Sequence, residues 1–119
     1  MANIYKNTKT DLTAASATTI YTVPSDSRSI VKSILVNDDS GSGDTITLTL
    51  TNAAGTVFSL FKVKAVAANT TIELLTKDLV LQSGEVLKVQ AAAANRLHVV
   101  ASIQEISKTR ITTSALSNI

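Results

Sequence analysis

The chain has 119 residues, a net charge of +2 and no cysteine, and its length fits one domain with a modest core. Without cysteine, disulfides, thiolate zinc sites and cysteine nucleophiles are excluded, and the eleven basic residues form no block with interleaved aromatic rings of the kind that nucleic-acid binders use. Apolar residues make up 45% of the chain but aromatic residues only 3%, so the core must consist of aliphatic side chains.

The sequence contains no run of 18 uncharged apolar residues, and its first residues contain no apolar stretch of signal-peptide length. We therefore expect no membrane-spanning segment, no membrane partner and no secretion by a signal peptide. The lack of cysteine also suits a reducing cytoplasm.

Apolar and polar residues alternate with a period of two along most of the chain, which predicts β-strands. The expected strands are residues 17–23, 29–37, 44–51, 56–63, 70–75, 79–81, 85–91 and 97–106. Turn-forming residues separate them, and no stretch of 11 or more residues keeps a helical apolar period. Such a series of seven or eight short strands predicts an all-β fold, an antiparallel β-sandwich with a jelly-roll-like arrangement.

The strand expected at 44–51, DTITLTLT, shows the alternation most clearly. Its apolar face consists of Ile46, Leu48 and Leu50, and threonines occupy the other face. The high β-propensity of threonine explains that polar face without a binding function. The preceding segment DDSGSGD (38–44) has the composition of a turn, so we expect the strands at 29–37 and 44–51 to form a hairpin.

Two of the expected strands carry apolar residues on both faces. In the strand at 29–37, strict alternation places Ile30, Ile34 and Val36 on one face and Val31 and Leu35 on the other. In the last strand, Leu97, Val99, Ala101 and Ile103 are expected inside, with Val100 and Ile106 outside. One face of a sandwich strand normally meets water. We therefore expect a partner subunit, or a terminal segment of this chain, to cover the outer face.

The acidic loop with Asp38, Asp39 and Asp44 allows two interpretations. A calcium loop needs oxygen ligands at alternating positions and a bidentate acid at its end. The spacing here differs from that pattern, and one short loop offers few carboxylates, so we favour a turn over a metal site and expect no metal.

The single histidine, His98, lies between Leu97 and Val99 and is expected on the face opposite the core. A serine–histidine–acid triad needs a nucleophile on a tight turn, and the sequence has no G-x-S-x-G motif. Glycine-rich phosphate loops are also missing from the sequence. We expect His98 to meet solvent or a partner protein, and we expect no catalytic residue and no cofactor.

The two ends of the chain are polar and poor in core pattern. They predict an N-terminal arm at 1–13 and a C-terminal arm at 107–119, on either side of a sandwich domain at 14–106. Arms of this kind could dock onto neighbouring subunits, for instance by adding a strand to a sheet edge. The candidate interface residues are Ile4 and Tyr5 in the first arm, Ile111 and Leu116 in the last arm, and the outward Val100 and Ile106.

Three stretches, at residues 2–13, 19–51 and 57–107, resemble small β-rich virion structural proteins of tailed bacteriophages, particularly phages of cyanobacteria and other aquatic bacteria. The resemblance lies in overall pattern: IYK near the start, TVP, VKSI-V-N, a late GE-LKV and ANRLHV-AS. It extends over nearly the whole chain up to about Ser107. The final segment, SKTRITTSALSNI, matches no pattern of that group.

The resemblance implies a decoration or cement-type protein that is made in the host cytoplasm and clamps neighbouring capsid subunits of the virion. Its expected partners are the major capsid protein or other virion proteins, and we expect a homo-oligomer without enzymatic activity. Two alternatives stay open at this point: a tail, neck or fibre component of the virion, and a β module that binds a host surface or a carbohydrate. Sugar-binding modules usually expose aromatic rings, and this chain has only two tyrosines for that purpose.

Overall fold

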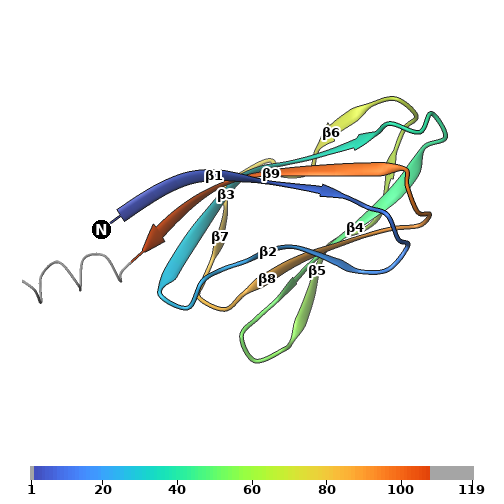
Figure 1. The fold of residues 1–119 in the computed structure, drawn as a ribbon. Coiled ribbons are helices and arrows are strands. Elements are labelled where there is room, and N and C mark those ends of the chain that lie inside the picture. The colour runs from blue at the N-terminus through green and yellow to red at the C-terminus, as the bar shows by residue number, and fades with distance from the viewer. Residues whose placement is uncertain (1, 108–119) are drawn as a thin grey trace, which may run out of the picture.

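The computed structural model describes residues 2–107, which form nine strands and no helix (Figure 1). The strands are β1 (Ala2–Asp11), β2 (Thr18–Thr22), β3 (Ser27–Asp38), β4 (Asp44–Thr51), β5 (Val57–Val66), β6 (Thr71–Glu73), β7 (Leu79–Leu81), β8 (Val86–Ala91) and β9 (Leu97–Ser107). Because this part of the chain has no helix, it also has none that could cross a membrane.

The strands form two antiparallel sheets that pack face to face. Sheet A has the order β1-β9-β3-β6, and β7 also pairs with β3; sheet B has the order β2-β8-β4-β5. Because β6 and β7 pair with opposite ends of β3, they act as two halves of one interrupted edge strand. With these halves merged, the strand orders of the two sheets are those of a jelly roll. The expected all-β antiparallel sandwich is confirmed.

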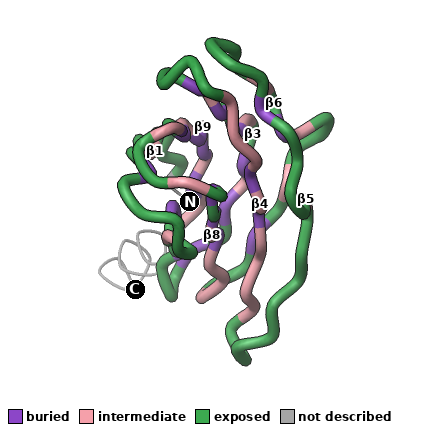
Figure 2. Tube along the Cα trace, turned by 90° about the vertical axis from the view of Figure 1, so that its right-hand side faces the viewer, coloured by how far each residue is buried: buried purple, intermediate pink, exposed green. Residues whose placement is uncertain are grey.

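The core lies between the sheets, and Figure 2 shows the buried stretches of their strands. Its side chains are almost entirely aliphatic. On β4, Ile46 and Leu48 are fully buried and Leu50 packs against the core, as the alternation predicted. The inward face of β9 is also confirmed: its buried residues are Leu97, Val99, Ala101 and Ile103, followed by Glu105. The threonines of β4 occupy the outer face of sheet B.

The alternation predicted for β3 is wrong at one point. Its register against β9 shifts between Val31 and Ser33, so one extra residue breaks the period of two. Val31 therefore lies inside with Ile34 and Val36, whereas Ile30 and Leu35 lie outside. The Glu73 carboxylate accepts a hydrogen bond from the Ile34 amide (N to Oε2, 2.7 Å) and another from the Ser33 hydroxyl beside the bulge.

The expected hairpin between β3 and β4 is also wrong, because the two strands lie in different sheets. The segment between them crosses from sheet A to sheet B around the buried carboxylate of Asp38. That carboxylate accepts hydrogen bonds from the Ser40 hydroxyl (2.6 Å) and from the amides of Ser40 (3.0 Å), Gly43 (2.7 Å) and Asn69 (3.3 Å). The Ser40 hydroxyl, with these amides, holds the pKa of Asp38 below its ordinary value. Turn-forming residues indicated a reversal, but they could not indicate which sheet the chain enters next.

The N-terminal segment, expected as an arm at 1–13, is part of sheet A in this structure. Residues 2–11 are β1, which pairs with β9 in an unbroken register from Ala2–Ser107 to Asp11–His98. Leu12 follows and is fully buried. The expected C-terminal arm, with Ile111 and Leu116, lies outside the described residues except for its first residue, Ser107.

Candidate protein interface

The outer face of sheet A carries apolar side chains from four strands, and we call them the sheet A patch. The patch consists of Tyr5, Ile30, Leu35, Val80, Val100 and Ile106. Tyr5 is 74% exposed and Val80 62% exposed, whereas Val100 and Ile106 are half-buried. The structure thus places three of the predicted interface residues, Tyr5, Val100 and Ile106, on one face.

Cross-strand pairing arranges this patch in rows. Tyr5 of β1 lies opposite Gln104 of β9, Gln104 lies opposite Ile30 of β3, and Ile30 lies opposite Val80 of β7. A second, shorter row joins Val100 of β9 to Leu35 of β3. The patch is therefore a flat, mixed surface without a deep pocket, which suits contact with another protein better than capture of a small molecule.

Ile4 does not belong to this patch. It lies opposite the inward Glu105 in the register of β1 and β9, although its side chain is still 42% exposed at the margin of the sandwich. Because adjacent residues of a strand point to opposite faces, Ile4 and Tyr5 cannot contribute to one flat interface.

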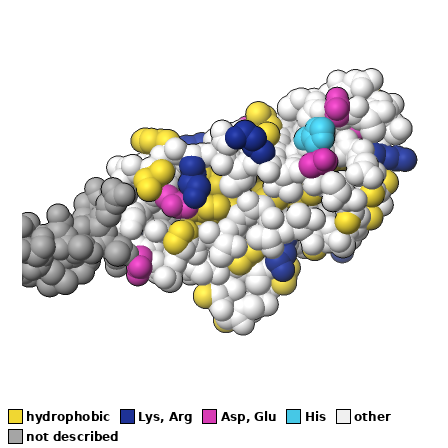
Figure 3. All heavy atoms as spheres, in the orientation of Figure 1, with side chains coloured by type: hydrophobic (Ala, Val, Ile, Leu, Met, Phe, Trp, Pro, Cys, Tyr) yellow, Lys and Arg dark blue, Asp and Glu magenta, His cyan; other side chains and the backbone are white. Residues whose placement is uncertain are grey.

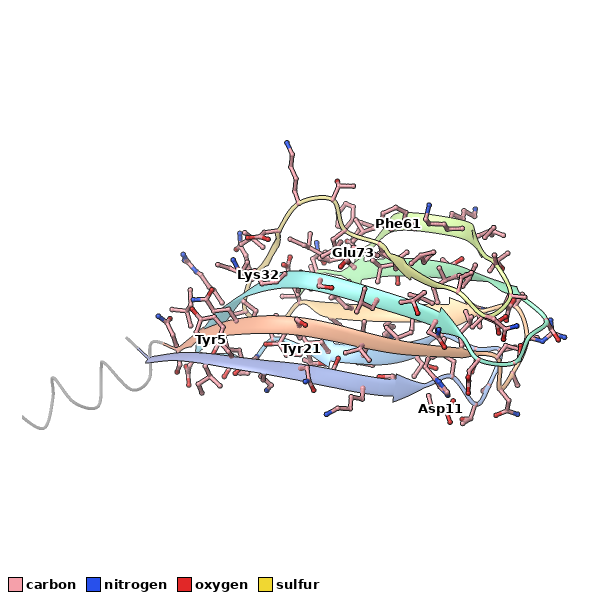
Figure 4. The ribbon with its side chains drawn as sticks, turned by 90° about the horizontal axis from the view of Figure 1, so that it is seen from above. Tyr5, Asp11, Tyr21, Lys32, Phe61 and Glu73 are labelled. Carbon is pink, nitrogen blue, oxygen red and sulfur yellow. The ribbon has the colours of Figure 1, made fainter. Side chains whose placement is uncertain are left out.

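A buried polar cluster fixes β1 to the rest of the sandwich. Tyr21 of β2 donates to the Glu105 carboxylate (Oη to Oε2, 2.5 Å), and its hydroxyl also lies 2.6 Å from the Ser29 hydroxyl. Lys6 of β1 donates to the same carboxylate oxygen over 3.1 Å. Burial, followed by the hydrogen bond to Glu105, raises the pKa of Tyr21 far above its ordinary value. The Tyr21 hydroxyl therefore stays protonated near neutral pH, and the cluster connects the four strands β1, β2, β3 and β9. Figure 4 shows Tyr21 beneath the strands of sheet A.

His98 lies on the outer face, as expected. Its Nε2 is 3.3 Å from Oδ1 of Asp11, and both side chains are about half exposed. Figure 3 shows the histidine directly above an acidic side chain. A shallow hollow of about 260 Å³ beside them is formed by residues 9–11 and 98–100, which include no serine. Among residues 2–107, no group of three histidine, aspartate or glutamate side chains could hold a metal ion. The site therefore offers a contact between a histidine and an aspartate beside a shallow hollow.

Sequence reasoning missed a second apolar surface, on β5. Of the eight large apolar side chains that are exposed in the described part of the chain, four lie on this strand: Val57, Phe58, Leu60 and Val63. The stretch VFSLFKV was read as an ordinary strand. Its one signal was that apolar residues occupy both alternating positions, which a half-buried strand does not need.

No protein-family model matches the sequence, and no curated protein is similar to it. Solved structures share the fold. A chain of the acidic stable capsid of Helicobacter pylori bacteriophage KHP30 aligns with a TM-score of 0.56 and 11% identity, covering 89% of each chain. A chain of the Bacillus endospore appendages, which form disulfide-linked pili, aligns with a TM-score of 0.53 and 15% identity over 88% of each chain.

A third similar chain comes from the Gx strain of infectious bursal disease virus, with a TM-score of 0.52 and 11% identity. It covers 87% of this chain but only 32% of the viral one. At these identities the likeness establishes the fold alone. The jelly-roll sandwich of this chain therefore occurs among capsid and pilus proteins.

Proposed function

We propose that this chain is a structural protein of a bacteriophage virion, most specifically a decoration or cement protein that clamps neighbouring capsid subunits. The observation that carries the proposal is the sheet A patch, a flat surface with exposed apolar side chains on a cysteine-free sandwich. The resemblance of the sequence to phage virion proteins and the likeness of the fold to a phage capsid chain both support it.

In this role the chain needs no catalytic residue, metal or cofactor. It would bind the major capsid protein or another virion protein through Tyr5, Val100 and Ile106, with copies of itself as neighbours in a homo-oligomer. Each contact could be modest, because many copies on one shell add their effects. The residues Ile111 and Leu116 are further candidates for these contacts.

Copy number in purified particles tests the proposal. A decoration protein should be present in numbers comparable with the major capsid protein, and a tail, neck or fibre component in far fewer copies. The likeness to a pilus chain is the observation that keeps a fibre role as the second candidate. Absence of the chain from purified particles would overturn both roles, and binding of the isolated domain on a glycan array would then favour a host-surface module.

A binding assay tests the patch itself. Particles that lack the chain should take up the purified wild type but not a Tyr5→Glu/Val100→Glu variant, because the added charges would have to be desolvated in the interface. Thr19→Glu on the exposed outer face of sheet B is the matched control and should bind normally. Equal uptake of all three proteins would show that the patch is not the interface.

A further inference from the structure

The strand β5 has one free edge, because β4 pairs with only one of its sides. Eight of its ten residues are exposed, and only Phe61 and Val66 reach into the sandwich. Figure 2 shows β5 as an exposed strand along almost its whole length, next to the partly buried β4. A long exposed strand edge with apolar side chains is a template for pairing with another strand.

Two register shifts change which residues of β5 lie on its inner side. The register against β4 shifts between Ile46 and Leu48 and again between Leu48 and Thr49. As a result Phe58, Phe61 and Lys64, each three residues apart, all lie on the inner side. Sheet A has only the short β6 and β7 opposite this margin, so Phe58 stays 49% exposed. Figure 4 shows Phe61 on the margin of the sandwich away from β1.

The outer side of β5 borders a shallow hollow with both polar and apolar lining residues. A shallow hollow of about 340 Å³ lies between β8 and β5, lined by Thr45, Thr47, Ser59, Lys62, Val63, Gln90, Ala91 and Ala92. Its lining contains one positive charge and no carboxylate. Val63 has a positive φ of 53°, a strained conformation for a β-branched residue, and its amide donates to the Thr47 hydroxyl over 3.0 Å.

The charges of β5 indicate which kind of protein segment could pair with its edge. The strand carries Lys62 and Lys64 and no acid, and neither lysine forms an ion pair with any residue from 2 to 107. Lys64 instead lies 5.8 Å from the ring centre of Phe61. Pairing β5 with β5 of a second copy would bring four lysines together without a carboxylate, which like-charge repulsion disfavours. A segment with acidic side chains would complement the same edge.

We propose that the free edge of β5 binds an extended segment of another protein, as an added strand whose side chains alternate between apolar and acidic. Backbone hydrogen bonds to the edge supply part of the affinity, apolar side chains on the inner face of the added strand cover Phe58 and its neighbours, and carboxylates on its opposite face pair with Lys62. The proposal names a partner for the proposed structural role and rests on that role for its biological setting.

Titration of the purified chain with two synthetic peptides tests the proposal. Both peptides have the length of β5 and alternate valine or threonine with a charged residue, which is glutamate in one and lysine in the other. We expect the glutamate peptide to bind about tenfold or more tightly than the lysine peptide. Added salt should reduce this difference, and amide NMR shifts should be concentrated in β5 and β4.

Three variants separate the contribution of charge from that of apolar contact. Lys62→Glu should weaken binding of the glutamate peptide about tenfold or abolish the preference, whereas Lys9→Glu, the same change on β1, should leave it unaltered. Phe58→Ser should weaken both peptides and keep the preference. Circular dichroism confirms that each variant is folded.

Equal binding of both peptides, amide shifts concentrated outside β5 and β4, or no binding would overturn the proposal. So would a dimer in sedimentation experiments that Phe58→Ser dissociates, because a second copy would then occupy the edge. These results leave the virion role to be decided by copy number in particles.

Discussion

The strands β1 and β5 are the outer strands of their respective sheets, yet they are held in opposite ways. β1 has mostly polar side chains and an unbroken register, and it is joined to β9 by the ion pair of Lys6 with Glu105 and by the contact of Asp11 with His98. β5 has mostly apolar side chains, two register shifts and no ion pair to any other described residue. A mostly polar strand can therefore be tightly paired within a sandwich, while a mostly apolar strand can be largely exposed.

The largest effect on stability is expected for a substitution that weakens the attachment of β1. Glu105→Ala should lower the free energy of unfolding by about 2–3 kcal/mol, because the Tyr21 hydroxyl and Lys6 lose their shared acceptor. Chemical denaturation measures this change, and hydrogen exchange should show faster opening of β1.

The matched control is Glu105→Gln, which keeps an acceptor for Tyr21 and removes only the charge. It should cost clearly less than the alanine variant. An equal cost would mean that the charge of Glu105 matters more than its hydrogen bonds.

A smaller loss of stability is expected for a substitution in β5. Phe61→Ala should cost about 1–2 kcal/mol, less than a fully buried phenylalanine, since this ring is only partly covered. Thermal or chemical denaturation measures the change. A loss as large as that of Glu105→Ala would contradict the view that β5 is weakly held.

Relief of strain in β5 should stabilise the protein. Val63→Gly should raise the free energy of unfolding by up to about 1 kcal/mol, because glycine accepts a positive φ and little apolar burial is lost at this exposed position. Ser59→Gly, in a regularly paired position of β5, is the control and should destabilise. A loss of stability in Val63→Gly would show that the conformation is not strained.

The smallest effects on stability are expected at the exposed aromatic residues. Tyr5→Ser should change the free energy of unfolding by no more than about 0.5 kcal/mol, since Tyr5 is 74% exposed, and Phe58→Ser by no more than about 1 kcal/mol, since Phe58 is half exposed. Their consequences should instead differ in binding: Tyr5→Ser in particle uptake, and Phe58→Ser in peptide binding. A single assay that responds to both variants would mean that the two surfaces act as one.

The sequence predicted the fold class because alternation is a local property, and β4 and the inner face of β9 follow it without interruption. It failed where one extra residue changes the phase: Lys32 lies within the bulge of β3, and β5 has two such irregularities. Neither hydrophobicity nor turn composition signals a bulge.

Other failures concern pairing between distant segments. β1 was missed because polar side chains give no core pattern, although its backbone pairs along its whole length. The connection from β3 to β4 was predicted wrongly because the composition of DDSGSGD indicates a turn but not which sheet the chain enters after it. Tyr5, Val100 and Ile106 could be predicted from their positions, whereas the rows that join them to Ile30 and Val80 depend on tertiary register.

The pairing of β1 with β9 joins residues that lie almost a whole chain apart, as the sequence separation of 99 between Lys6 and Glu105 illustrates. During translation β1 leaves the ribosome early and must wait for β9, so sheet A closes only after nearly all of the described chain has been made. Long-range closure of this kind slows folding. It also means that the complete rows of the sheet A patch, which pass through β9, can form only after β9 has been made.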